Sequence, residues 1–142
     1  MRILHLVILL FFGLQTSIAQ ETALFDKDGE CRAYIDFDQD ATIFLVNGVA
    51  AAFLEKDGDE IGIIGFNGEF LGWYEYGVLY DEKGDIVGFR EGALNISTSA
   101  APTFQVGFAP ITPISPIFPF QPYLSSRWSS QSLTEFLYFG KR

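Results

Sequence analysis

The stretch Phe66-Asn67-Gly68-Glu69-Phe70-Leu71-Gly72-Trp73 contains the clearest copy of a pattern that this chain repeats four times. Each copy is a turn glycine, three residues, a Gly or Ala, and then an aromatic residue. The copies occupy residues 29–34, 48–53, 68–73 and 84–89, so their turn glycines are 19, 20 and 16 residues apart. Self-similarity at such a short period indicates one supersecondary unit that is repeated along the chain.

Each copy is expected to form a β-hairpin. Asn47-Gly48 and Asn67-Gly68 are the strongest local hairpin signals, because both central residues of a type I′ turn need positive φ. The Asp-x-x-Gly sequences at residues 26–29 and 81–84 suit a type I turn that ends in a left-handed glycine. No helical stretch of useful length precedes residue 92. The sequence therefore predicts an all-β domain over residues 20–92, with eight strands in four sequential hairpins.

The second strand of each hairpin is apolar on both faces. Since adjacent strand residues point to opposite faces, we expect Phe70 and Gly72 on one face and Leu71 and Trp73 on the other. Two apolar faces predict a strand that is covered on both sides. The recurring small residue predicts close approach by the equivalent strand of a neighbouring hairpin about a central axis. This residue is Ala33, Ala52, Gly72 or Gly88 in successive copies.

Residues 1–19 have the pattern of a signal peptide. Arg2 supplies the positive charge, an apolar run follows, and Ser17-Ile18-Ala19 is a small-x-small cleavage site. We expect cleavage after Ala19, export to the periplasm or the extracellular space, and no membrane-spanning segment in the mature chain.

The chain is acidic, with 18 Asp and Glu residues against 9 Lys and Arg residues and a formal net charge of −9. This charge disfavours nucleic acid and anionic membranes as partners. Cys31 is the only cysteine, and the only histidine is His5, inside the predicted signal peptide. An intramolecular disulfide is therefore excluded, as are histidine-based triads and zinc sites in the mature protein. We expect a protein that is not an enzyme, without cofactor or catalytic residues.

Residues 93–125 form a Pro-rich tail. Five prolines recur at every third residue, which is the period of polyproline II, and apolar residues lie between them. These prolines are Pro110, Pro113, Pro116, Pro119 and Pro122. We expect the tail to fold against its own domain, dock on an envelope partner or mediate self-association. Residues 126–142 should contain one short helix, because Ser132 and Glu135 form a capping-box pattern and Gly140 is a stop signal.

The repeats and their D/N-G turns, with the phrases at residues 66–73 and 79–89, resemble the 4-fold β-flower domain of small bacterial proteins. The resemblance covers residues 22–91. It implies hairpins arranged as petals about a pseudo-four-fold axis, and it brings no catalytic residue to this chain. Choline-binding repeats share the period and a Gly-Trp phrase, and bacterial Tyr-Asp repeats share Tyr80-Asp81, but each matches a single copy.

The repeated aromatic residues are the candidate binding residues. Exposed aromatics at equivalent repeat positions would suit sugars or quaternary amines. The other interpretation places them in the core or beneath the tail. These residues are Tyr34, Phe53, Trp73 and Phe89.

Asp36, Asp38 and Asp40 resemble the start of an EF-hand loop, but Ala41 and Asn47 replace the required Gly and Glu. We therefore predict no metal site of that kind, and a looser calcium contact stays open. The favoured function is a non-enzymatic exported binding or structural module of the bacterial envelope, acting through repeat-presented surfaces and the Pro-rich tail. The alternatives are a carbohydrate- or small-ligand-binding repeat protein and a carboxylate-based hydrolase.

Overall fold

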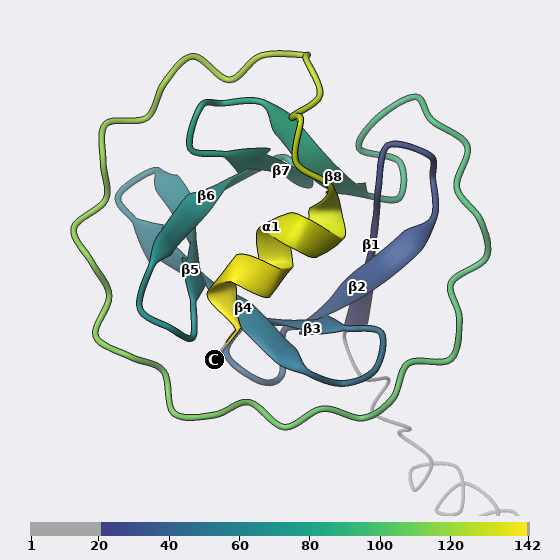
Figure 1. Cartoon of the computed structure of the whole chain (residues 1–142), viewed down its shortest axis with the longest axis horizontal. Coiled ribbons are helices and arrows are strands. Elements are labelled where there is room, and N and C mark those ends of the chain that lie inside the picture. The colour runs from purple at the N-terminus through teal and green to yellow at the C-terminus, as the bar shows by residue number, and fades with distance from the viewer. Residues whose placement is uncertain (1–20, 142) are drawn as a thin grey trace, which may run out of the picture.

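A computed structural model describes residues 21–141, so the predicted signal peptide, residues 1–19, lies outside the described range. Within that range the chain forms eight strands and one short helix (Figure 1). The elements are β1 (Glu21–Phe25), β2 (Cys31–Asp36), β3 (Thr42–Leu45), β4 (Ala50–Asp57), β5 (Glu60–Gly65), β6 (Phe70–Glu75), β7 (Val78–Asp81), β8 (Ile86–Arg90) and α1 (Leu133–Gly140). The predictions of an all-β fold and of a short helix after the tail are confirmed.

The strands form a closed barrel. Each strand pairs antiparallel with the next, and β8 closes the ring by pairing with β1 through Leu24–Arg90 and Phe25–Phe89. Closure removes the free sheet edges that would otherwise invite pairing with other chains. Figure 1 shows the ring of strands with α1 at its centre.

Four turns of one geometry connect the strands in pairs: turn 1 (residues 26–29), turn 2 (45–48), turn 3 (65–68) and turn 4 (81–84). In each turn the last residue is a glycine with φ between +76° and +87°, and its N–H donates to the carbonyl three residues earlier at 2.8–3.0 Å. Asn47 and Asn67 do not have positive φ. The predicted type I′ turns are therefore wrong, and all four are type I turns that end in a left-handed glycine. A type I′ geometry instead fits Tyr76 and Gly77, with φ of 49° and 82°, between β6 and β7.

A β-bulge follows each of turns 1 to 4. It is seen as a shift of one residue in the pairing of the two strands that the turn connects. On β6 the shift puts Leu71 in the buried cluster around α1, whereas Phe70 and Trp73 both belong to a cluster on the outer face. The expectation that Leu71 and Trp73 share a face is therefore wrong. Side chains alternate strictly between the two faces of a sheet only where no bulge interrupts the pairing of the strands.

The two glycines of this set have close neighbours, but the neighbour is the first strand of the adjoining hairpin and not the predicted equivalent strand. A Cβ added at Gly72 would overlap the carbonyl oxygen of Tyr80 on β7. At Gly88 it would lie 3.1 Å from the carbonyl oxygen of Phe25 on β1 and 2.9 Å from a methyl group of Leu133. The adjoining strand therefore leaves no room for a side chain at Gly72, and the adjoining strand and the central helix together leave none at Gly88.

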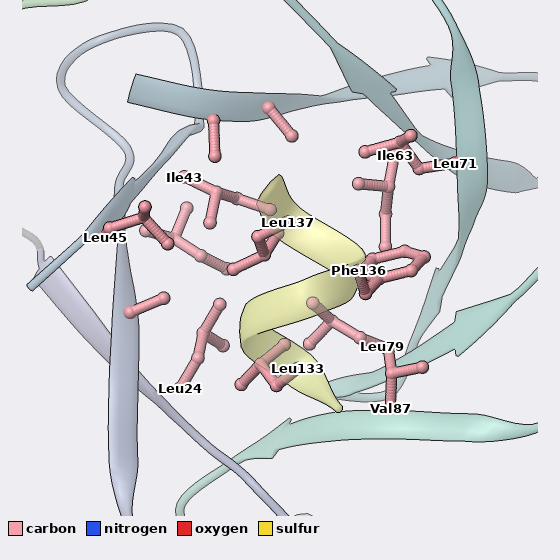
Figure 2. Close-up of a cluster of buried hydrophobic side chains, with 14 residues drawn as sticks. Leu24, Ile43, Leu45, Ile63, Leu71, Leu79, Val87, Leu133, Phe136 and Leu137 are labelled. Carbon is pink, nitrogen blue, oxygen red and sulfur yellow. The ribbon is translucent and has the colours of Figure 1, made fainter. Parts of the chain in front are cut away.

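The helix α1 fills the lumen of the barrel (Figure 2). Leu133, Phe136 and Leu137 are buried there against side chains from the strands. Ser132 caps the helix, since its hydroxyl accepts a hydrogen bond from the N–H of Glu135 at 3.1 Å. The capping half of the predicted box is thus confirmed. The strand residues around the helix are Leu24, Ala33, Ile35, Ile43, Leu45, Ala51, Ala52, Ile63, Leu71, Leu79 and Val87.

Residues 91–132, called the belt below, connect β8 to α1 and contain the Pro-rich tail. The belt includes no helix and no strand, and Figure 1 shows it running around the outside of the barrel. It returns to the strand from which it started, where Ile86 donates to the carbonyl of Arg127 at 2.7 Å and Ser129 donates to the carbonyl of Ile86 at 2.8 Å. The belt therefore covers the outer face while α1 fills the inner one.

Candidate binding surface

The four aromatic residues predicted from the repeats lie on the outer face of the barrel but are not exposed. Tyr34 is 2% exposed, Phe53 5%, and Trp73 and Phe89 0%. A sugar or amine cannot reach these rings while the belt and their aromatic neighbours cover them. The second interpretation, in which they form part of the core beneath the tail, matches this burial.

Belt residues provide much of this cover. The Tyr34 ring stacks on Phe104, with centroids 4.4 Å apart, and its hydroxyl donates to the backbone carbonyl of Gln105 at 2.8 Å. Burial raises the pKa of Tyr34 above its usual value, so the phenol remains a hydrogen-bond donor at neutral pH. This hydrogen bond ties the belt to β2 across 71 residues of sequence.

Further along the belt, Phe118 packs against Trp73, with ring centroids 6.0 Å apart, and Trp128 packs against Phe89 at 6.2 Å. The indole Nε1 of Trp73 is buried without a hydrogen-bond partner among the described residues. Phe53 is covered differently, by Phe66 at 5.3 Å. The repeat-equivalent aromatics therefore anchor belt rings at three of the four positions.

The exposed apolar surface lies instead on the belt itself. Six large apolar side chains, at every third residue, are between 83% and 102% exposed. We call this row the ridge, and it consists of Phe108, Ile111, Ile114, Ile117, Phe120 and Tyr123. Side chains of the same segment that are offset from the ridge, such as Phe118 and Leu124, pack against the barrel. A period of three places one edge of an extended chain outward and another inward.

The ridge is held in place by polar contacts from the barrel. The side chain of Gln39 donates to the carbonyl of Gly107 at 3.0 Å and accepts from the N–H of Ala109 at 2.8 Å. Residues 92–126 contain no Asp, Glu, Lys or Arg. The ridge thus presents large, uncharged side chains that can bury area against a partner. Sequence reasoning found the apolar tail but not which of its edges faces outward.

Charged groups near the belt stabilise turns. The Asp26 carboxylate accepts from Arg32 Nε at 2.9 Å and from the backbone N–H groups of Asp28 and Glu30. Burial acts to raise the pKa of Asp26, but these hydrogen bonds outweigh burial and hold the pKa below its usual value. Asp36, considered above as a calcium ligand, accepts from the N–H of Asp38 and the amide of Gln39. Within residues 21–141 no three His, Cys, Asp or Glu side chains are grouped to hold a metal ion.

In the part of the chain that the structure describes, no helix combines the length and apolarity needed to cross a bilayer.

Comparison with known proteins gives one match. The family model described as "4-fold beta flower protein" matches residues 22–137. This match extends beyond the hairpins, through the belt and into α1. No curated protein and no solved structure matches the chain. Because the family model spans barrel, belt and helix together, the chain belongs to the 4-fold beta flower family.

Proposed function

We propose that this protein is a non-enzymatic exported module of the bacterial envelope that binds a partner through the ridge of its belt. The observation that carries the proposal is the exposure of six large apolar side chains in one row. Monomeric soluble proteins rarely expose contiguous apolar surface of this extent unless it serves an interaction. The partner is an envelope protein or a second copy of this chain.

The course of the belt supports this proposal. β8 ends at Arg90, and α1 begins at Leu133, which contacts the position of Gly88 on the same strand. A short loop would join two points that lie so close together. The belt instead uses residues 91–132 to travel around the barrel, and in doing so it carries the ridge. The belt is therefore longer than the connection from β8 to α1 requires, and its added length carries the exposed ridge.

The proposal includes a pseudo-four-fold arrangement of the hairpins and a polyproline II course for the Pro-rich part of the belt. Four turns of one geometry, each followed by a bulge, favour the first. The exposure of every third residue favours the second. Proline restricts the backbone before binding, which lowers the entropy cost of docking.

A ridge variant tests the proposal. The triple substitution Ile111→Ser, Ile114→Ser and Ile117→Ser should leave the thermal unfolding transition unchanged, because these side chains are at least 95% exposed. The full chain and the variant are expressed in a bacterium, crosslinked in intact cells and analysed in envelope fractions. We expect the wild type to form crosslinked species that the variant lacks.

The matched control is Tyr76→Ser, which removes an 87% exposed aromatic ring that is not part of the ridge, at the loop between β6 and β7. It should retain all crosslinks. Identical crosslinking by the wild type and the ridge variant would contradict the proposal. Intact-mass measurement of the same material shows whether residues 1–19 are removed.

A further inference from the structure

Three of the four turns bind the backbone of the belt. At turn 1 the N–H of Ser99 donates to the carbonyl of Gly29 at 2.8 Å, and at turn 4 the N–H of Ser125 donates to the carbonyl of Gly84 at 2.8 Å. At turn 2 the N–H of Gln105 donates to the carbonyl of Val46 at 3.2 Å. An extended chain is therefore recognised repeatedly by the same local structure.

The turn glycines make this recognition possible. A Cβ added at Gly29 would overlap the carbonyl oxygen of Ser97, and one added at Gly84 would overlap that of Tyr123. In both cases the carbonyl over the glycine belongs to the residue two positions before the serine whose N–H is bound. Turns 1 and 4 thus hold equivalent three-residue segments of extended backbone. At Gly48 the carbonyl oxygen of Val106 would lie 3.1 Å from the added Cβ.

Turn 3 has the same internal geometry but no such segment. Gly68 has a φ of +87° and donates to Gly65 at 2.9 Å, as the other turn glycines do. No described atom outside its immediate chain neighbours lies within 4 Å of the position where its Cβ would be. The belt passes elsewhere, because Phe118 packs over Gly62 on β5. The turn itself is fixed from the other side, where Asn67 donates to the carbonyl of Gly140 at 3.1 Å.

A cavity of about 760 Å³ opens beside this turn. It lies between turn 3, turn 4, the end of the belt and α1. The charged lining residues are four carboxylates and one ammonium group, which leaves a net negative charge, and Phe139 contributes a ring that is 70% exposed. The carboxylates belong to Glu69, Asp81, Glu82 and Glu135, and the ammonium group belongs to Lys83. The cavity therefore combines apolar contact with negative charge, which favours a side chain with an aliphatic stem and a cationic end.

We propose that turn 3 and this cavity bind an extended peptide segment of a partner protein that carries a basic side chain. The segment pairs its backbone with the Gly68 carbonyl in the way that Ser99 and Ser125 pair with theirs. Its Lys or Arg side chain enters the cavity and faces Glu69 and Glu135. This site is separate from the ridge and does not depend on the function proposed for it.

The probe is a synthetic nonapeptide with the sequence of residues 119–127, PFQPYLSSR. It contains the backbone that turn 4 already binds and ends in an arginine. Titrated into the ¹⁵N-labelled full chain, it should give saturable shifts of the Asn67, Gly68 and Glu69 amide signals. The Gly29 and Gly48 signals should stay in place, because the belt occupies those turns and neither turn lines the cavity. Absence of shifts at turn 3 overturns the proposal. So do equal shifts at all turns, which would mean that the peptide displaces the belt.

Two glycine variants make the test specific. Gly68→Asn keeps a residue that tolerates positive φ but adds a side chain where the peptide carbonyl must approach. It should bind the peptide at least tenfold more weakly. Gly58→Asn is the matched control, since Gly58 also has positive φ, at +61°, and nothing within 4 Å of its Cβ position. It should bind normally. Unchanged binding by Gly68→Asn contradicts the proposal.

The role of charge is tested by Glu135→Gln together with a peptide in which alanine replaces the arginine. Each change alone should weaken binding about threefold to tenfold, as partly exposed ion pairs do. The two changes together should weaken binding no further than the alanine peptide alone, because without the arginine Glu135 has no contact left to lose. Fully additive losses would contradict the placement of the basic side chain. Glu135 lies in α1, so Glu135→Gln leaves the four turns unchanged.

Discussion

The inner and outer faces of this barrel are built from different side chains, although the same strands supply both. The lumen contains mainly aliphatic and small residues, and among the described residues Phe136 of α1 is the one aromatic residue that is buried there. The outer face contains aromatic rings, among them Phe25, Tyr34, Phe70 and Trp73. The difference reflects what covers each face. A helix fills a closed lumen from within, whereas a single extended chain covers the outside and needs large flat rings beneath it.

The largest loss of stability is expected from a substitution that adds a side chain where the barrel has no room for one. Gly72→Val puts a side chain against the Tyr80 carbonyl on the paired strand, where neither backbone can move without breaking the barrel. We expect loss of the cooperative unfolding transition in circular dichroism. The control Lys56→Ala, at an exposed position on β4, should unfold as the wild type does. A folded Gly72→Val protein would show that the lumen is less tightly packed than described.

The second largest loss of stability is expected when the contacts of α1 in the lumen are removed. Leu137 is completely buried against the strands, and Leu137→Ala should lower the free energy of unfolding by about 2–5 kcal/mol. The measurement is urea denaturation followed by circular dichroism. Tyr138→Ala is the neighbouring control on the exposed side of α1, at 50% exposure, and should cost much less. Equal effects at both positions would mean that α1 does not enter the lumen.

The outer cover should be weaker, because it is one chain thick. Phe118→Ala removes the belt ring over Trp73 and should cost about 2 kcal/mol, since the side chain is only partly buried. The exposed Trp73 indole should then shift its fluorescence emission to the red. Phe120→Ala, at a fully exposed ridge position, should change neither quantity. If Phe118→Ala lowered the free energy of unfolding as much as Leu137→Ala does, the belt would stabilise the barrel as strongly as α1, which would contradict this expectation.

A smaller effect concerns the turns on which the belt rests. Asp26→Asn removes the ion pair with Arg32 at turn 1 and should cost about 1 kcal/mol at pH 7. Because the pKa of Asp26 is lowered in the folded state, its contribution is complete above the unfolded pKa of about 3.9. It is lost as the pH falls through the lower, folded pKa. The stability difference between wild type and variant should therefore shrink below about pH 4. A difference that is constant with pH would contradict the lowered pKa.

The smallest effect should be found on the ridge. Ile114 is 96% exposed, so Ile114→Ser should change the free energy of unfolding by less than about 0.5 kcal/mol. Differential scanning calorimetry of this variant beside Phe118→Ala compares the outward and inward edges of one segment. A destabilised Ile114→Ser protein would show that the ridge packs on its own barrel.

The sequence predicted the repeats and their boundaries well, because positive φ at Gly29, Gly48, Gly68 and Gly84 is a local requirement. It did not reveal the bulges, since one extra residue such as Leu71 leaves no distinctive signal in an apolar strand. The wrong assignment of faces follows from that single omission. The course of the belt was also out of reach, because contacts such as Tyr34 to Gln105 span 71 residues. The period of the prolines and the apolar residues between them predicted that this segment packs against a protein surface, but not which surface.

The central position of α1 has a consequence for the order in which the protein can fold. All eight strands are synthesised before the helix that fills the lumen, and before the belt that covers the outer rings. The belt is synthesised before residues 133–137, so the inner faces of the strands are the last to receive their cover. Contacts this distant in sequence also form slowly. The core of the barrel is therefore complete only after almost the whole chain has been synthesised.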